Sequence, residues 1–416
     1  MDNIANNKDS TSLVDPVVIV SALRTPIGAF QGVYANISAP KLGGYVIEGL
    51  LNQTGLDSNL ISEVLMGCVL SAGLGQAPTR QAAIYGKLSN TVPCTTVNKM
   101  CGSSLKTIVQ AYNNLLSDNQ KIIIAGGMEN MTQAPYIIPK ARAGLRLGHG
   151  VLLDHMFYDG LEDAYEKGCL MGHFAERTAK KYNFTRQAQD EFALNSANRA
   201  IQAVNNNLFN KEIIAVKHTA KNQEILINQD ETPGKIDLNK ISKLSPAFVK
   251  PEDLKTGTGT VTAANSSSIS DGAAGLILMR LSKAKEYNLK PLAKIIGYSE
   301  VAQEPAWFTT APVKAIKNLL EKLNNNLKLS LSDIGLFEIN EAFAVVTMAA
   351  MHDLDIAHNR VNINGGACAL GHPIGATGAR IVTTLVHAMH AKKQEYGIAS
   401  LCIGGGEAIA LGVQAL

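Results

Sequence analysis

Two spacings of apolar residues recur along the chain, and together they predict an α/β protein. Short apolar runs at 16–21, 122–127, 292–298 and 400–403 have the length of buried strands. A run of apolar residues three and four positions apart follows residue 102, which predicts a helix there. The members of that helix face are Leu105, Ile108, Val109, Tyr112 and Leu116.

The order of these segments indicates a duplicated architecture. A strand-like run opens each half, at 16–21 and at 292–298, and a strand that runs into glycines comes near the end of each half, at 122–127 and at 401–405. Ligand sites favour the junction of such halves. We therefore expect two α/β halves with the functional site between them.

Cys101 directly precedes the first predicted helix, in the segment Asn-Lys-Met-Cys-Gly-Ser at 98–103. The free amides and the positive end of a helix N-terminus favour thiolate over thiol, so this position is expected to lower the pKa of Cys101. Gly102 and the serines after it leave room for a substrate. The alternative is a structural cysteine, because buried cysteines commonly pack as small apolar residues.

His372 lies in a second glycine-rich loop, Gly-His-Pro-Ile-Gly-Ala-Thr-Gly at 371–378, which leads into the apolar helical stretch 381–385. Pro373 fixes the turn, and the glycines let backbone or ligand come close. Core packing explains a histidine among so many glycines poorly. The favoured interpretation is a neutral imidazole that acts as a base.

Two further segments carry weaker signals. Cys402 ends a predicted strand before a glycine turn, so it could be a second acid/base thiol beside amides that face an oxyanion, or a plain strand end. Asn340 lies where a strand gives way to a helix, in Glu-Ile-Asn-Glu-Ala-Phe at 338–343. It could cap the helix, or it could hold a water or a substrate carbonyl.

Composition and charge narrow the class of protein. A chain of 416 residues that is 46% hydrophobic can bury a large core in two or three domains, and a net charge of +3 gives no sign of nucleic-acid binding. The six cysteines lack metal-type spacing and indicate reduced thiols in a cytoplasmic protein. Residues 1–15 are polar and do not resemble a presequence, and no apolar run is long enough to span a membrane.

In its motifs and their order, the chain resembles the thiolase family from about residue 16 to the C-terminus. The motifs are Asn-Lys-Met-Cys-Gly-Ser, Asn-Glu-Ala-Phe, Gly-His-Pro-Ile-Gly-Ala and Cys-Ile-Gly-Gly-Gly. The resemblance implies that Cys101 is acylated, that His372 activates it, and that Cys402 moves a proton at the substrate α-carbon. It implies one oxyanion hole from His372 and a water held by Asn340. It implies a second from the backbone amides of Cys101 and Gly404.

The resemblance also implies the thiolase fold. This fold has two similar α/β layered halves with five-stranded mixed sheets, αβαβα in order, and a loop domain inserted in the first half. The expected divisions are a disordered tail at 1–15, the first part of the N-terminal half at 16–131, an inserted CoA-binding domain at 132–265, the return to the N-terminal half at 266–290, and the C-terminal half at 291–416. Within the insertion we expect a helical region at 171–207 and an exposed loop at 221–240.

Carried over by position, the resemblance places a set of residues around the pantetheine and acyl groups of the substrate, although ordinary core packing explains the apolar ones equally well. The set is Leu161, Met171, Ala247, Phe248, Ala263, Ser267, Ala342 and Phe343. Three positions depart from many biosynthetic thiolases, where His, Ser and Arg stand in place of Leu170, Lys240 and Ser245. The contacts to CoA are therefore expected to differ in detail.

The motif variants favour one branch of the family. Lys-Met before the cysteine, Ile-Gly-Ala after the histidine and the three glycines at 404–406 follow the biosynthetic form, acetyl-CoA acetyltransferase, which joins two acetyl-CoA into acetoacetyl-CoA and CoA reversibly. Residues 266–271 are closer to some degradative 3-ketoacyl-CoA thiolases, which remain the alternative. The expected partners are acetyl-CoA, acetoacetyl-CoA, CoA and further copies of the chain in a homodimer or homotetramer. No cofactor, metal, nucleic acid or membrane is expected.

Other classes fit less well. Ketoacyl-acyl-carrier-protein synthases share the duplicated fold but use Cys-His-His or Cys-His-Asn, which the Cys402 motif argues against. A non-catalytic acyl or lipid carrier should have lost Cys101, His372 or Cys402, and all are present. A protease or disulfide reductase lacks support, since the chain has no Cys-x-x-Cys and no papain-like histidine segment.

Overall fold

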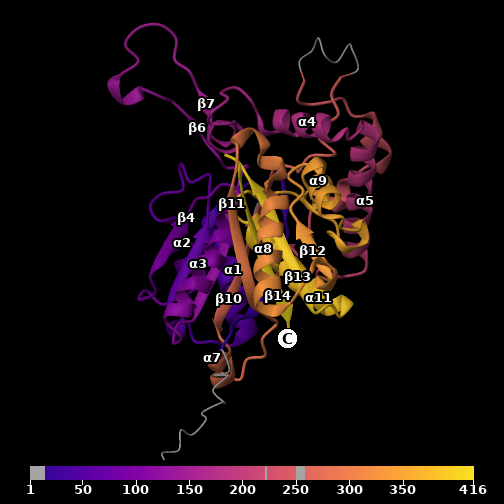
Figure 1. The fold of residues 1–416 in the computed structure, drawn as a ribbon. Coiled ribbons are helices and arrows are strands. Elements are labelled where there is room, and N and C mark those ends of the chain that lie inside the picture. Colours follow the sequence, from indigo (N-terminus) through magenta and orange to yellow (C-terminus); the bar gives the residue numbers. More distant parts are fainter. Residues whose placement is uncertain (1–14, 221–222, 250–257) are drawn as a thin grey trace, which may run out of the picture.

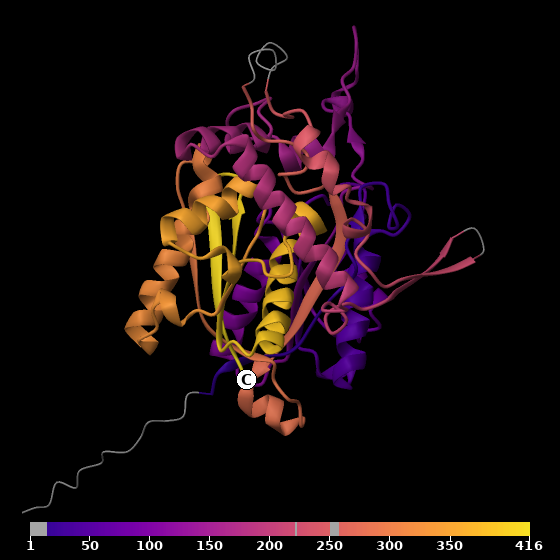
Figure 2. The same cartoon turned by 90° about the vertical axis from the view of Figure 1, so that its right-hand side faces the viewer.

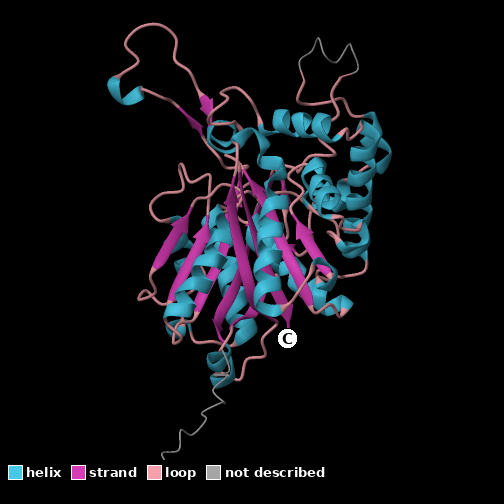
Figure 3. Ribbon diagram, in the orientation of Figure 1, coloured by secondary structure: helices cyan, strands magenta, loops and turns pink. Residues whose placement is uncertain are grey.

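The computed structural model describes residues 15–220, 223–249 and 258–416, so the expected tail at 1–15 lies outside the described residues except for Asp15. One sheet of ten strands runs through the molecule in the order β12-β13-β14-β11-β1-β10-β5-β3-β4, with β2 beside β10 (Figures 1 and 3). The strands of the first half are β1 (Val17–Arg24), β2 (Gly28–Ala29), β3 (Glu63–Gly67), β4 (Cys94–Val97), β5 (Ile123–Asn130) and β10 (Ser270–Arg280). Those of the second half are β11 (Ala293–Ala302), β12 (Leu336–Ile339), β13 (Tyr396–Ile403) and β14 (Glu407–Ala415).

The two halves meet through a short antiparallel contact between β1 and β11, where Val18 pairs with Lys294 and Ile19 with Ala293. These are the strands that the apolar runs at 16–21 and 292–298 predict, so that expectation is confirmed. In the second half, an isolated parallel bridge between Phe337 and Val361 lies beside β12 in place of a fifth strand.

Helices cover both faces of the sheet, because successive residues of the strands point to opposite sides and both sides are apolar. Val17 and Ile19 pack in the central core with α3 (Ser103–Ser117) and α11 (Thr377–Lys392), which contact strands of both halves. Val18 and Val20 pack in an outer core with α1 (Ala39–Thr54) and α2 (Pro78–Tyr85). The other outer core holds α8 (Ala311–Leu327) and α9 (Ala344–Leu354), which completes the layered α/β architecture.

The segment between β5 and β10 lies across one end of the sheet (Figures 1 and 2). The expected helical region at 171–207 is confirmed as two helices, which separate at Asn183 in the left-handed conformation. The exposed loop expected at 221–240 is wrong in part, because β9 pairs with β8 in a hairpin whose residues 221–222 lie outside the described residues. The elements here are β6 (Tyr136–Ile137), β7 (Leu153–Asp154), the π-helix η3 (Phe157–Leu161), α4 (Met171–Tyr182), α5 (Arg186–Asn205), β8 (Val216–Ala220) and β9 (Gln223–Ile227).

The remaining helices of the described residues are short. They are α7 (Leu281–Glu286), α10 (Ala367–Leu370) and the 3-10 turns η1 (Ser58–Leu60), η2 (Ala141–Ala143), η4 (Pro233–Lys235), η5 (Leu238–Lys243), η6 (Pro305–Thr310), η7 (Leu331–Asp333) and η8 (His358–Arg360). Within the described ranges, no helix is both long enough and apolar enough to cross a membrane.

Candidate active site

Cys101 lies in a tight turn two residues before α3, as its position next to the predicted helix indicates. Met100 adopts a φ of 48°, in the left-handed region that side chains rarely occupy. Ser103 holds this turn, since its hydroxyl accepts a hydrogen bond from the Lys99 amide at 2.9 Å and donates to the Met100 carbonyl at 2.6 Å. A Cβ on Gly102 would lie 2.4 Å from Ile403, so glycine there lets the cysteine turn approach β13 closely.

The pKa of Cys101 is raised, to about 11, so the expectation of a lowered pKa is wrong. Burial is the largest cause, because the free energy lost when a thiolate leaves water exceeds the stabilisation that the helix N-terminus provides. Hydrogen bonds from the backbone of Gly404 and of Cys101 itself oppose the rise. The Gly404 amide therefore faces the Cys101 sulfur, which places both backbone donors of the expected second oxyanion hole beside the thiol.

His372 is held in one tautomer by its neighbours. Its Nδ1 lies 2.6 Å from the Thr377 hydroxyl, and that hydroxyl donates its proton to the Pro373 carbonyl at 2.9 Å. Since the hydroxyl proton is already used, Nδ1 must carry the proton that joins the two side chains. Nε2 then carries the free lone pair, and it is buried without a partner among the described residues.

The imidazole of His372 is neutral, as the sequence predicts. Burial lowers the pKa of His372 to about 3, and the Arg380 guanidinium contributes in the same direction. His372 is 7% exposed, and its Nε2 is shielded from water. A neutral, desolvated lone pair is the form that a general base needs.

Asn340 does not cap a helix. The helix after it, α9, begins at Ala344, so the capping interpretation is wrong. Asn340 is 1% exposed, and neither its Nδ2 nor its Oδ1 has a hydrogen-bond partner in the described part of the chain. Because buried amides are nearly always paired, both atoms indicate a water or ligand group that the protein alone does not supply.

Residues 265–268 tie the loops of the site together through the backbone. The Asn265 carbonyl accepts from the Ala344 amide at 2.8 Å, and the Ser267 amide donates to the Ala342 carbonyl at 2.9 Å. The Ser268 carbonyl accepts from the His372 amide at 3.1 Å. The segment after Asn340 and the His372 loop therefore share one support.

Cys402 is fully buried near the end of β13, where it pairs with Ala408 across the β13–β14 hairpin. Its pKa is raised well above the usual range, first by burial and then by the negative charge that a Cys101 thiolate would carry. The two sulfurs therefore lie close enough to influence each other, and their simultaneous ionisation is disfavoured.

The expected pocket residues divide into three groups. Met171 and Phe248 pack with Cys402 and the adjoining apolar pair Ala342 and Phe343. Leu161, at the end of the π-helix, packs with Cys101 in a separate apolar cluster.

The third group lies outside both clusters. Ala247 and Ala263 are exposed, and Ser267 is half-buried and bound to the Ala342 carbonyl. The structure thus gathers five of the eight expected residues around the two thiols.

Sequence reasoning missed Thr377, Ser104 and Glu129. The Ser104 hydroxyl accepts from the Ala379 amide at 3.0 Å and so joins the start of α3 to the start of α11. The carboxylate of Glu129 is buried and accepts from the amide of Gly375, in the His372 loop, at 2.9 Å. The sequence offers one indication of Glu129, which is an acidic residue near the end of an otherwise apolar strand, after Gly126 and Gly127.

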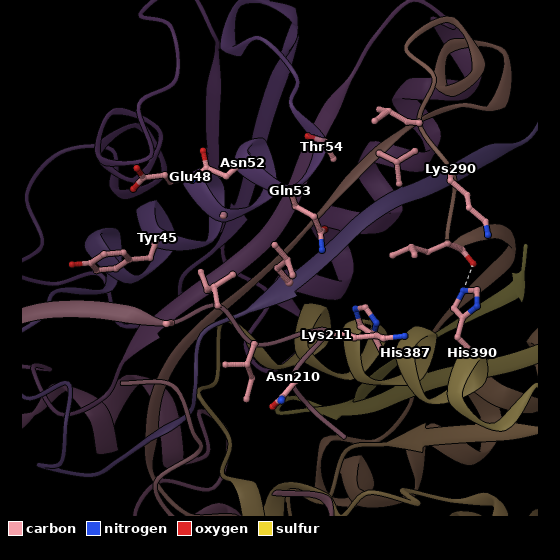
Figure 4. A pocket seen from close by; sticks show the side chains of 18 of the residues that line it. Tyr45, Glu48, Asn52, Gln53, Thr54, Asn210, Lys211, Lys290, His387 and His390 are labelled. Carbon is pink, nitrogen blue, oxygen red and sulfur yellow. Dashed lines mark hydrogen bonds between the residues drawn. The ribbon is translucent and has the colours of Figure 1, made fainter. Parts of the chain in front are cut away.

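A large cavity lies away from these residues. It has a volume of about 1160 Å³, contains none of the expected site residues, and has Lys211, His387 and His390 in its lining (Figure 4). His390 is 13 residues beyond Thr377 on α11, which at 1.5 Å per residue places it roughly 20 Å away. Across the described ranges, no group of three or more His, Cys, Asp or Glu side chains is arranged to hold a metal ion.

Comparison with known proteins places this arrangement in a family. Residues 17–282 match the family model described as thiolase, N-terminal domain, and residues 289–415 match thiolase, C-terminal domain. A probable acetyl-CoA acetyltransferase of Dictyostelium discoideum is 43% identical over 415 residues, which are 100% of this chain and 97% of that protein. A probable acetyl-CoA acyltransferase of Staphylococcus aureus is 44% identical over 95% of this chain and 98% of its own length.

Solved structures agree. The Acat5 thiolase from Ascaris suum, crystallised with coenzyme A, superimposes with a TM-score of 0.89 at 41% identity, over 96% of this chain and 100% of that one. The Bacillus anthracis acetyl-CoA acetyltransferase gives a TM-score of 0.91 at 37% identity, over 97% and 99%. The chain belongs to the thiolase family and is an acyltransferase.

Proposed function

We propose that this enzyme is an acetyl-CoA C-acetyltransferase that interconverts two acetyl-CoA with acetoacetyl-CoA and CoA through an acetyl group on Cys101. The observation that carries the proposal is the set of buried, unpartnered polar atoms on His372 and Asn340, in loops that one backbone segment holds together. Burying such atoms without a partner destabilises the fold unless a substrate or a bound water forms hydrogen bonds with them. They support a site built to receive a polar reacting group.

In the thiolysis direction, the neutral Nε2 of His372 takes the Cys101 proton as the sulfur attacks the keto carbon. The oxyanion at that carbon accepts hydrogen bonds from the amides of Cys101 and Gly404, which flank the sulfur. Collapse breaks the carbon–carbon bond, leaves acetyl-Cys101 and releases the enolate of acetyl-CoA. Donors at His372 and at a water held by Asn340 stabilise the enolate oxygen.

Cys402 completes the proton balance. Its raised pKa keeps the thiol protonated, so it can give its proton to the enolate carbon, and the protonated His372 then restores it. CoA next loses its thiol proton to His372 and attacks acetyl-Cys101, and the leaving Cys101 sulfur takes that proton back. In the synthetic direction, the acetylated Cys101 sulfur can no longer become a thiolate, so it cannot oppose ionisation of Cys402 at the step where Cys402 acts as a base.

The apolar surroundings of Cys101 support a short acyl group. Leu70, Met131 and Met156 are almost fully buried in the cluster against which Cys101 and Leu161 pack. Rates of thiolysis of acetoacetyl-CoA and of 3-ketodecanoyl-CoA, followed by loss of substrate absorbance with CoA present, test this. We expect cleavage of the short substrate alone. Equal cleavage of both would make the enzyme a broad degradative thiolase, and cleavage of neither would overturn the proposed function.

Thr377→Val is expected to lower kcat by about ten- to a hundredfold with little change in KM for CoA, because Nδ1 loses the acceptor that fixes its tautomer. Thr377→Ser keeps the hydroxyl and should restore kcat. Steady-state thiolysis kinetics measure both. Thr383→Val is the matched control, since Thr383 is equally buried on α11 but its hydroxyl has no partner among the described residues. An equal loss in Thr383→Val would contradict a role for the Thr377 hydroxyl.

Homo-oligomer formation and a cytoplasmic location stay predictions, as does the absence of a metal or other cofactor. The outer edge of β4, whose residues are half-exposed or exposed, supports the first of them. So does the segment between β6 and β7, where Leu147 is 97% exposed and Leu152 is 63% exposed. Free strand edges and apolar surfaces of this kind are commonly covered by a second copy of the chain.

A further inference from the structure

We infer that Glu129 is a positioning residue: its buried carboxylate fixes the loop that carries His372 against the first half of the fold, and so aligns His372 with Cys101. This inference rests on the proposed functions of those two residues. Glu129 belongs to β5 in the first half, whereas the His372 loop belongs to the second. One side chain therefore joins the two halves beneath the reacting groups.

The carboxylate of Glu129 accepts hydrogen bonds at both oxygens. Oε2 accepts from the amides of Val69 at 3.0 Å and Gly375 at 2.9 Å. Oε1 accepts from the amide of Leu70 at 3.1 Å, and the Cys68 thiol lies 3.8 Å away. These donors come from two segments, the turn after β3 and the His372 loop.

Both bound segments reach Cys101. Leu70 and Val69, after β3, and Ile374, in the His372 loop, form the apolar cluster against which Cys101 packs. Gly375 is three residues beyond His372, in a turn that begins at Pro373, whose carbonyl accepts from the Ala376 amide at 2.9 Å. A shift of Gly375 would therefore move both the imidazole and one wall of the Cys101 pocket.

Close packing around Gly375 fixes the position of the His372 loop. A Cβ on Gly67 would lie 2.6 Å from the Gly375 carbonyl oxygen, and a Cβ on Gly127 would lie 2.0 Å from it. A Cβ on Gly375 itself would lie 2.7 Å from Glu129 Oε2. The backbone of the His372 loop thus packs directly on Gly67 and Gly127, and the Glu129 carboxylate binds the Gly375 amide.

A carboxylate is needed here rather than an amide. All the groups of the described residues that face Glu129 at hydrogen-bond distance are donors, and a glutamine would turn one of its two acceptor oxygens into a donor. In either orientation of the amide, at least one backbone donor loses its acceptor and meets a second N–H. Glu129→Gln therefore keeps the shape of the side chain and breaks the hydrogen bonding at one of its two oxygens.

The charge of Glu129 gives a second readout that packing alone would not change. Burial raises the pKa of Glu129 to about 7, so the carboxylate is ionised above neutral pH. Its negative charge raises the pKa of the Cys101 thiol. Removing that charge should let Cys101 form a thiolate at lower pH, even while the misplaced His372 slows turnover.

The test compares Glu129→Gln with the wild-type enzyme in two assays. In steady-state thiolysis of acetoacetyl-CoA we expect kcat to fall about ten- to a hundredfold, the effect of a displacement near 1 Å, with KM for CoA unchanged. In alkylation of Cys101 by iodoacetamide between pH 7 and 11, roughly the range from the Glu129 pKa to the Cys101 pKa, we expect the rate to rise at a lower pH than in the wild type.

Glu231→Gln is the matched control. The carboxylate of Glu231 also accepts from two backbone amides, those of Ala29 and Val33, but it lies outside the site. It should keep the wild-type kcat and alkylation profile. If Glu129→Gln does not fold, Gly375→Ala attacks the same contact from the loop side, and we expect the same fall in kcat at unchanged KM.

Wild-type kcat in a folded Glu129→Gln or Gly375→Ala enzyme would overturn the inference and leave the proposed function intact. An equal fall in Glu231→Gln would also overturn it, because the loss would then not be specific to this anchor. A wild-type enzyme that cleaves no 3-ketoacyl-CoA would instead overturn the proposed function, whatever the variants do.

Discussion

Cys101→Ser is expected to lower thiolysis of acetoacetyl-CoA by about a thousandfold or more, because a hydroxyl is a much weaker nucleophile and leaving group than a thiol. The serine fits the turn that Ser103 and Gly102 shape, so the fold should persist. Steady-state kinetics with circular dichroism as a check of folding measure the effect. Turnover near the wild-type level would contradict the assignment of Cys101 as the nucleophile.

Cys94→Ser is the control for that variant. Cys94 is also a partly buried free thiol, but it lies on β4, where its sulfur donates to the Val92 carbonyl at 3.4 Å and interacts with the Arg80 side chain. It should leave kcat unchanged. A comparable loss in both variants would indicate general damage to the protein rather than loss of the acyl acceptor.

Cys402→Ser is expected to separate the two chemical steps. Turnover should fall about a hundred- to ten-thousandfold, the usual contribution of a positioned acid or base, because a serine hydroxyl neither gives nor takes the α-carbon proton readily. Acetylation of Cys101 by acetyl-CoA does not need that proton and should continue. Exchange of labelled CoA into acetyl-CoA measures acetylation alone.

Retained exchange with lost condensation is therefore the pattern that supports Cys402 as the proton carrier. Loss of both would mean that Cys402 supports Cys101 rather than the α-carbon. Unchanged condensation would remove Cys402 from the mechanism.

The sequence predicts the features of this fold that depend on local pattern. The run at 16–21 becomes β1 because its alternate residues meet apolar partners on both faces of the sheet. Ile19 packs in the central core and Val18 in an outer core. The position of Cys101 before α3 follows from the apolar spacing after it. A neutral His372 follows from its apolar, glycine-rich surroundings.

Features that depend on contacts between distant segments cannot be predicted from local patterns in the sequence. The Cys101 pKa rises because the folded protein buries the thiol, which local helix geometry does not reveal. Glu129 and Gly375 are 246 residues apart, and only the fold brings them together. The β8–β9 hairpin also differs from expectation, because its strands pair with each other rather than with the main sheet.

The measurement that tests the central claim most directly is mass spectrometry of the enzyme mixed with acetyl-CoA, quenched in acid and digested. The account predicts one acetyl group on the peptide that contains Cys101, removed again when free CoA is added before the quench, and absent in Cys101→Ser. An enzyme that turns over acetoacetyl-CoA while this peptide stays unmodified, or that carries the acetyl group on Cys402 instead, would contradict it.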